Sequence, residues 1–158
     1  MPSDAATAPT SLQGACFCGS ASYTVTGKPV LSAYCHCTNC QRLNGCPFVH
    51  TAHFEAENFS WNFSEPPDER LDRFAIPSRP HKTRVRCKNC GAGVASYNST
   101  TNRWSVWGAL LRRGSDGAIE GWDIVRPTAH IFYGTRMLDI GDSLGKWEGY
   151  ENRSVQLA

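Results

Sequence analysis

The sequence predicts a mainly β fold with few helices, and three observations support this prediction. Phe59, Trp61 and Phe63 alternate with small polar residues, which is the period of two expected of a half-buried strand. Short runs rich in β-branched and aromatic residues recur along the chain, and turns containing glycine or proline separate them. Apolar residues at helical spacing are nearly absent. A chain of 158 residues, 41% of them apolar, is long enough to bury the core of one domain.

The other strands are predicted from β-branched and aromatic content, and their ends from turn residues. Residues 21–26 form the first, and Gly27-Lys28-Pro29 closes it as a turn. Residues 30–34 form the second, which leads directly into Cys35. The remaining expected strands are residues 48–54, 71–76, 94–97, 103–110 and 129–133. The expected breaks between them are residues 65–68, 77–80, 98–102 and 113–117.

Composition limits the domain organisation and the compartment. We expect residues 1–11 to be a disordered arm, residues 12–150 to form one zinc-binding domain and residues 151–158 to be a tail. No segment is apolar enough to span a membrane, and no signal peptide is recognisable. The eight cysteines lie in CxC and CxxC clusters, which favours a reduced, cytoplasmic metalloprotein over a secreted disulfide protein. A net charge of +2 makes a nucleic-acid partner unlikely, and the sequence leaves an oligomer possible.

The stretch Cys35-His36-Cys37-Thr38-Asn39-Cys40 is the strongest functional signal. Three thiols within a short polar stretch fit poorly as core residues and well as ligands of one soft metal ion. Zinc is the first expectation, since it binds thiolates tetrahedrally and is redox-inert. Structural zinc sites are closed by four ligands, whereas catalytic sites keep one position open. The identity of the fourth ligand therefore decides the function.

Two further cysteine clusters complete the metal-binding pattern. Gly14-Ala15-Cys16-Phe17-Cys18-Gly19 is a CxC flanked by glycines, and Cys87-Lys88-Asn89-Cys90-Gly91 is a zinc-knuckle CxxC. The CxC and the CxxC each supply two cysteines, the stretch from Cys35 to Cys40 supplies three, and Cys46 is the eighth. These eight divide into a closed four-sulfur site and a second site with three or four sulfurs. Spacing alone does not say which clusters pair.

Several residues near these clusters have alternative interpretations. Cys46 is a fourth metal ligand, a reactive thiol or a small buried apolar residue. His36 is a general base or an ordinary residue behind the ligands. A run of basic residues is a solvated strand face or receives an anionic ligand. The members of this run are Arg79, Lys82, Arg84, Arg86 and Lys88.

The order of these motifs resembles one known family. The segments concerned are Gly14 to Gly19, Cys35 to Cys40, Gly45-Cys46-Pro47-Phe48 and Arg84 to Gly91. Together they are similar to the glutathione-dependent formaldehyde-activating enzyme family, also called the centromere protein V domain family, over roughly residues 12–150. Seven cysteines in this order are far more specific than one CxxC.

The resemblance implies a β-tent of packed antiparallel sheets that holds two zinc ions. Its structural site would be formed by Cys16, Cys18, Cys87 and Cys90, and its catalytic site by Cys35, Cys37 and Cys40. The implied activity is a carbon–sulfur lyase that joins glutathione, as co-substrate, to formaldehyde or another small electrophile. Arg42, Lys82, Arg84 and Arg86 are then candidates to hold the glutathione carboxylates.

Three hypotheses follow from the fourth position of the three-cysteine site. An open position predicts a zinc-dependent enzyme for thiol–aldehyde adducts. Closure by Cys46 predicts two structural zinc ions in a non-catalytic module that binds protein or nucleic acid. A free Cys46 beside the metal predicts a reactive thiol.

Overall fold

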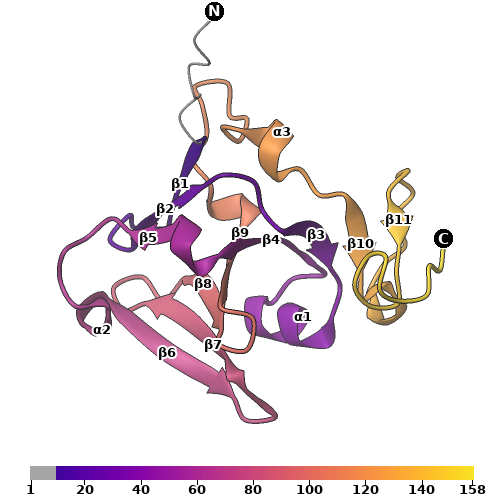
Figure 1. Cartoon of the computed structure of the whole chain (residues 1–158), viewed down its shortest axis with the longest axis horizontal. Coiled ribbons are helices and arrows are strands. Elements are labelled where there is room, and N and C mark those ends of the chain that lie inside the picture. Colours follow the sequence, from indigo (N-terminus) through magenta and orange to yellow (C-terminus); the bar gives the residue numbers. More distant parts are fainter. Residues whose placement is uncertain (1–9) are drawn as a thin grey trace, which may run out of the picture.

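A computed structural model describes residues 10–158, and it confirms a mainly β fold with few short helices (Figure 1). The expected disordered arm falls mostly outside these residues, and strand β1 already begins at Ser11. The strands are β1 (Ser11–Ala15), β2 (Ser22–Thr26), β3 (Leu31–Cys35), β4 (Val49–Glu55), β5 (Phe59–Trp61), β6 (Leu71–Ile76), β7 (Arg79–Cys87), β8 (Gly93–Asn98), β9 (Arg103–Trp107), β10 (Ala129–Ile131) and β11 (Gly145–Lys146). The helices are α1 (Thr38–Asn44), α2 (Pro67–Arg70) and α3 (Trp122–Val125), with single 3-10 turns at Ala56–Asn58, Gly108–Leu110 and Tyr133–Thr135.

The strands form a small and a large sheet. The small sheet has the order β1-β2-β5, and the large sheet has the order β11-β10-β3-β4-β9-β8-β7-β6. All pairings are antiparallel except those of β10, which lies parallel to both β3 and β11. The sheets are therefore antiparallel as expected, apart from this one edge, where β10 reaches β3 from far along the chain.

The main core lies between the two sheets. Tyr23 from the small sheet and Phe54 from the large one are completely buried. Phe59 stacks on Trp104 with ring centroids 4.4 Å apart, so aromatic rings join the sheets directly. A second, smaller core lies beneath the end of β3 and includes Val49 and Ile131. Cys35 is itself part of this core, so the three-cysteine stretch begins at a well-packed strand end.

The C-terminal residues fold back against the large sheet. The Lys146 N–H donates to the Ala158 carbonyl over 2.7 Å, and Trp147 forms a β-bridge with Gln156. Backbone hydrogen bonds thus hold the end of this segment, although most side chains of residues 151–158 are exposed. No helix among residues 10–158 is long and apolar enough to cross a membrane.

Candidate metal centres and active site

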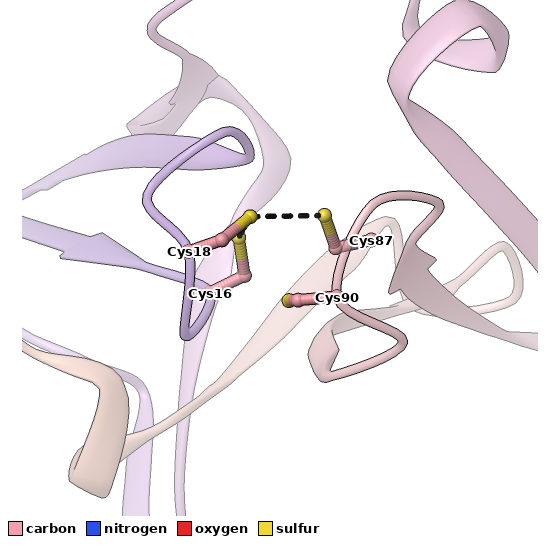
Figure 2. A group of neighbouring side chains, drawn as sticks. All are labelled: Cys16, Cys18, Cys87 and Cys90. Carbon is pink, nitrogen blue, oxygen red and sulfur yellow. Dashed lines mark hydrogen bonds between the residues drawn. The ribbon is translucent and has the colours of Figure 1, made fainter.

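The first candidate metal centre brings Cys16, Cys18, Cys87 and Cys90 together from two loops (Figure 2). Their four sulfur atoms all lie within 4.8 Å of one another. The Sγ–Sγ distances are 3.6 Å for Cys16–Cys18 and 3.8 Å for Cys18–Cys87. A tetrahedron of sulfurs around zinc has edges of about 3.8 Å, since Zn–S bonds are about 2.3 Å long. The residues present therefore fit a closed zinc site.

The local backbone explains how the two loops present these thiols. Gly19 and Gly91 have φ angles of +79° and +74°, a left-handed conformation that glycine adopts without strain. The Ala21 N–H donates to Cys16 Sγ and the Asn89 side chain donates to Cys18 Sγ, both over 3.3 Å. The Asn89 hydrogen bond is the largest contribution that lowers the pKa of Cys18 to about 6. Such donors stabilise a thiolate and so favour metal binding.

The second centre is formed by Cys35, Cys37 and Cys40. Cys35 ends β3, Cys37 caps the N-terminus of α1, and Cys40 lies in the first turn of that helix. Their sulfurs also lie within 4.8 Å of one another. Hydrogen bonds with the Cys35 and Cys40 thiols lower the pKa of Cys37, and the Cys40 N–H donates to Cys37 Sγ over 3.3 Å. Three thiols at this spacing fit one metal ion, and all three residues line the cavity.

Cys46 lies outside this three-cysteine group. Its thiol donates to the Phe48 carbonyl over 3.3 Å, and its side chain packs against the second core. Burial raises the pKa of the Cys46 thiol, which makes it a weaker nucleophile. Of the three interpretations of Cys46, the geometry favours the small apolar residue, which is half-buried here.

His36 does not line the cavity, which favours the interpretation as an ordinary residue behind the ligands. Its side chain is completely buried, and its ring stacks on Phe48 at 4.8 Å. Its Nε2 lies 2.9 Å from Nδ1 of His130, whose Nε2 lies 2.9 Å from Asp142 Oδ2. Because the Asp142 carboxylate can only accept a hydrogen bond, His130 Nε2 is the donor to it. The two successive hydrogen bonds therefore orient both imidazole rings. Lys146 Nζ donates to the same carboxylate over 2.9 Å, so a buried polar network supports the three-cysteine stretch from behind.

The three cysteines open into a cavity of about 680 Å³ above the large sheet. Arg84 and Lys82 line this cavity as expected, whereas Arg42 and Arg86 do not. A β-bulge between Val85 and Arg86 breaks the alternation of β7, and Arg42 is exposed on α1. The basic residues that line the cavity are Lys28, Arg79, Lys82, Arg84, Arg103, Arg126 and Arg153.

The floor of the cavity is a polar row that crosses four strands. His53 of β4 is paired with Ser105 of β9, which is paired with Ser96 of β8 and through it with Arg84 of β7. The Arg84 guanidinium donates to the Ser96 hydroxyl. Burial lowers the pKa of His53 to about 4, and the charges on Lys82, Arg103 and Arg84 contribute to the shift.

We expect His53 to stay neutral down to about pH 4, with consequences for stability. As the pH falls, His53 in the unfolded chain takes up a proton near pH 6.5, whereas in the folded protein it stays neutral until about pH 4. The free energy of unfolding therefore decreases as the pH falls from about 6.5 to about 4. This one group contributes a slope of at most about 1.4 kcal/mol per pH unit. An NMR titration of the imidazole measures the midpoint directly, and His53→Gln should flatten the slope. A midpoint near 6.5 would contradict the expectation.

Comparison with known proteins identifies the family. The model of the family described as "Glutathione-dependent formaldehyde-activating enzyme" matches residues 11–135, which is most of the chain. The chain belongs to this family. A crystal structure of a Rhodobacter sphaeroides protein is similar at 17% identity with a TM-score of 0.49, covering 68% of this chain and 96% of that one. No curated protein matches the chain.

The match to the glutathione-dependent formaldehyde-activating enzyme family ends at residue 135. Residues beyond this point also line the cavity. Tyr150, Glu151, Asn152 and Arg153 also line it. Sequence reasoning missed these residues, together with His53 and Arg126, because no motif marks them and only the fold brings them to the cavity. The alternating basic residues of β7 were the one available signal, and they indicated part of the cavity wall.

Proposed function

We propose that this protein is a zinc-dependent enzyme that joins an anionic thiol, with glutathione the first candidate, to formaldehyde or a similar small aldehyde. The observation that carries the proposal is the placement of the three-cysteine group. Cys35, Cys37 and Cys40 lie at the wall of a large cationic cavity, and Cys46 does not close the group. Family membership supports the same reaction class.

The proposed reaction forms one carbon–sulfur bond. The thiol sulfur attacks the aldehyde carbon, the carbonyl π bond breaks, and the oxygen accepts the proton that the thiol gave up. A zinc ion held by the three cysteines would make the thiol acidic enough to react as thiolate at neutral pH.

The residues of the chain bind and orient the substrate. Lys82 and Arg84 place positive charge in the same cavity as the three cysteines, where it would stabilise the adduct oxygen as that oxygen becomes negative. The same charges attract a thiol that carries carboxylates. The cavity walls then hold thiol and aldehyde together, which is the main contribution needed for an addition that already proceeds slowly in water.

Exchange NMR tests the proposal, because the adduct also forms without an enzyme and only its rate is informative. The zinc-loaded protein is mixed with glutathione and ¹³C-formaldehyde, and the rate of exchange between free and adduct carbon is measured. We expect clear acceleration over protein-free buffer and over the protein after zinc removal. Unchanged exchange for glutathione with formaldehyde and with a panel of small aldehydes would contradict the proposal. X-ray absorption at the zinc edge gives a second readout, since the added thiol should increase the sulfur coordination.

A further inference from the structure

The cavity has a strongly uneven distribution of charge. Seven lysines and arginines line it, but among residues 10–158 its lining contains one carboxylate, that of Glu151. An acidic side chain in a cavity repels a carboxylate ligand and so weakens the binding of anions. The single acid therefore indicates a positively charged group on the ligand.

Glu151 is held in place for such a contact. The Thr128 hydroxyl donates to Glu151 Oε2 over 2.6 Å, which fixes the carboxylate and leaves Oε1 without a side-chain partner among residues 10–158. No ion pair is found for Glu151 in that part of the chain, whereas Glu55 is paired with Arg103 at 3.0 Å. Arg126 and Arg153 line the cavity near Thr128 and Glu151 in the sequence. A carboxylate and guanidinium groups that line the same cavity can together bind an amino-acid head, the carboxylate its ammonium and the guanidinium groups its carboxylate.

The position of Glu151 fits a ligand whose sulfur lies at the three-cysteine group. Cys35 is opposite Ile131 in the β3–β10 pair, and Thr128 precedes Ile131 by three residues. Three extended residues span about 10 Å. In glutathione, seven bonds separate the sulfur from the carbon that bears the ammonium, a span on the order of 9 Å when extended. The two lengths agree.

The opposite wall carries the other half of the recognition. Figure 1 shows the β6–β7 hairpin and the C-terminal segment on opposite sides of α1. Strand β6 forms one edge of the large sheet, and strand β11 forms the other. Lys82 and Arg84 of β7 line the cavity without an acidic partner in the described ion pairs, so this wall suits a plain carboxylate. Glutathione has a plain carboxylate at its glycine end and a zwitterionic head at its γ-glutamyl end.

We propose that Glu151 binds the ammonium of the γ-glutamyl head and thereby sets the direction in which glutathione lies, with its glycine carboxylate at Lys82 and Arg84. This inference rests on the proposed function, since it takes glutathione as the thiol. It assigns specificity to the C-terminal segment, which lies beyond the family match.

Calorimetric binding to the zinc-loaded protein tests the inference without requiring turnover. The probes are glutathione and its des-amino analogue, in which hydrogen replaces the amino group. We expect wild-type protein to bind glutathione about tenfold more tightly than the analogue, which corresponds to one partly buried ion pair. In Glu151→Gln the Kd for glutathione should rise about tenfold, and the Kd for the analogue should change less than about twofold. Glu148→Gln is the matched control, because Glu148 is exposed on the same segment and does not line the cavity.

Two outcomes would overturn the inference. One is a wild-type protein that binds the analogue as tightly as glutathione, a result that needs no variant to fold. The other is an equal loss of affinity for both probes in Glu151→Gln. Failure of the proposed function is a separate result, because it leaves the binding preference intact and shows only as absent acceleration in exchange NMR.

Discussion

Cys37→Ser is expected to reduce the rate of adduct formation by more than about a hundredfold while the protein stays folded. Changes one shell beyond a metal's ligands already cost about 10–100-fold in affinity or activity, so loss of a ligand should cost more. Cys37 is half-buried at the N-terminus of α1, next to the cavity and remote from the core between the sheets. Its loss therefore removes the reactive centre and spares the sheet packing.

The measurement combines exchange NMR, zinc content and thermal unfolding. We expect zinc content to fall from about two ions to about one per chain, because the four-cysteine group is untouched. Cys46→Ser is the matched control, since it removes a nearby thiol that lies outside both cysteine groups. Retained activity in Cys37→Ser, or an equal loss in Cys46→Ser, would contradict the assigned roles.

Motif order predicted the cysteine groups because short-range spacing determines which thiols converge within each cluster. Cys35, Cys37 and Cys40 lie on one strand end and one helical turn, so their proximity is almost local. The pairing of the CxC with the CxxC cluster came only from the family resemblance, since it depends on how the small sheet packs on the large one. The strands with alternating or β-branched patterns were also predictable, and β6 lies at the expected residues.

The cavity was much harder to predict, because it depends on non-local pairing. His53, Ser105 and Ser96 become a row only through the register of three antiparallel strands. The lowered pKa of His53 depends on its burial and also on charges from two other strands. The two interpretations of His36 could not be separated from the sequence, because its burial depends on Phe48 and His130, which other parts of the chain bring next to it. Glu151 reaches the cavity only because the C-terminal segment folds back on β10.

Cys87→Ser is expected to have the largest effect on stability. Cys87 is 1% exposed and ends β7 in the large sheet, while its sulfur faces the loop that leaves β1 in the small sheet. Because the four-cysteine group joins the two sheets, binding energy at this site is folding energy, which reaches about 10 kcal/mol or more in zinc-finger peptides. Loss of one ligand from a closed site, with a buried hydroxyl left in its place, should cost more than about 4 kcal/mol.

For a chain of this length that loss lowers Tm by about 8–16 °C, measured by differential scanning calorimetry at fixed zinc concentration. A chelator added to the wild-type protein should produce a decrease at least as large, since it also removes the ion of the four-cysteine group. The two variants should differ in a defined way. Cys37→Ser should lose activity at a nearly unchanged Tm, whereas Cys87→Ser should lose activity together with a lower Tm. A Cys87→Ser protein that keeps both its zinc content and its Tm would show that the four-cysteine group does not hold the sheets together.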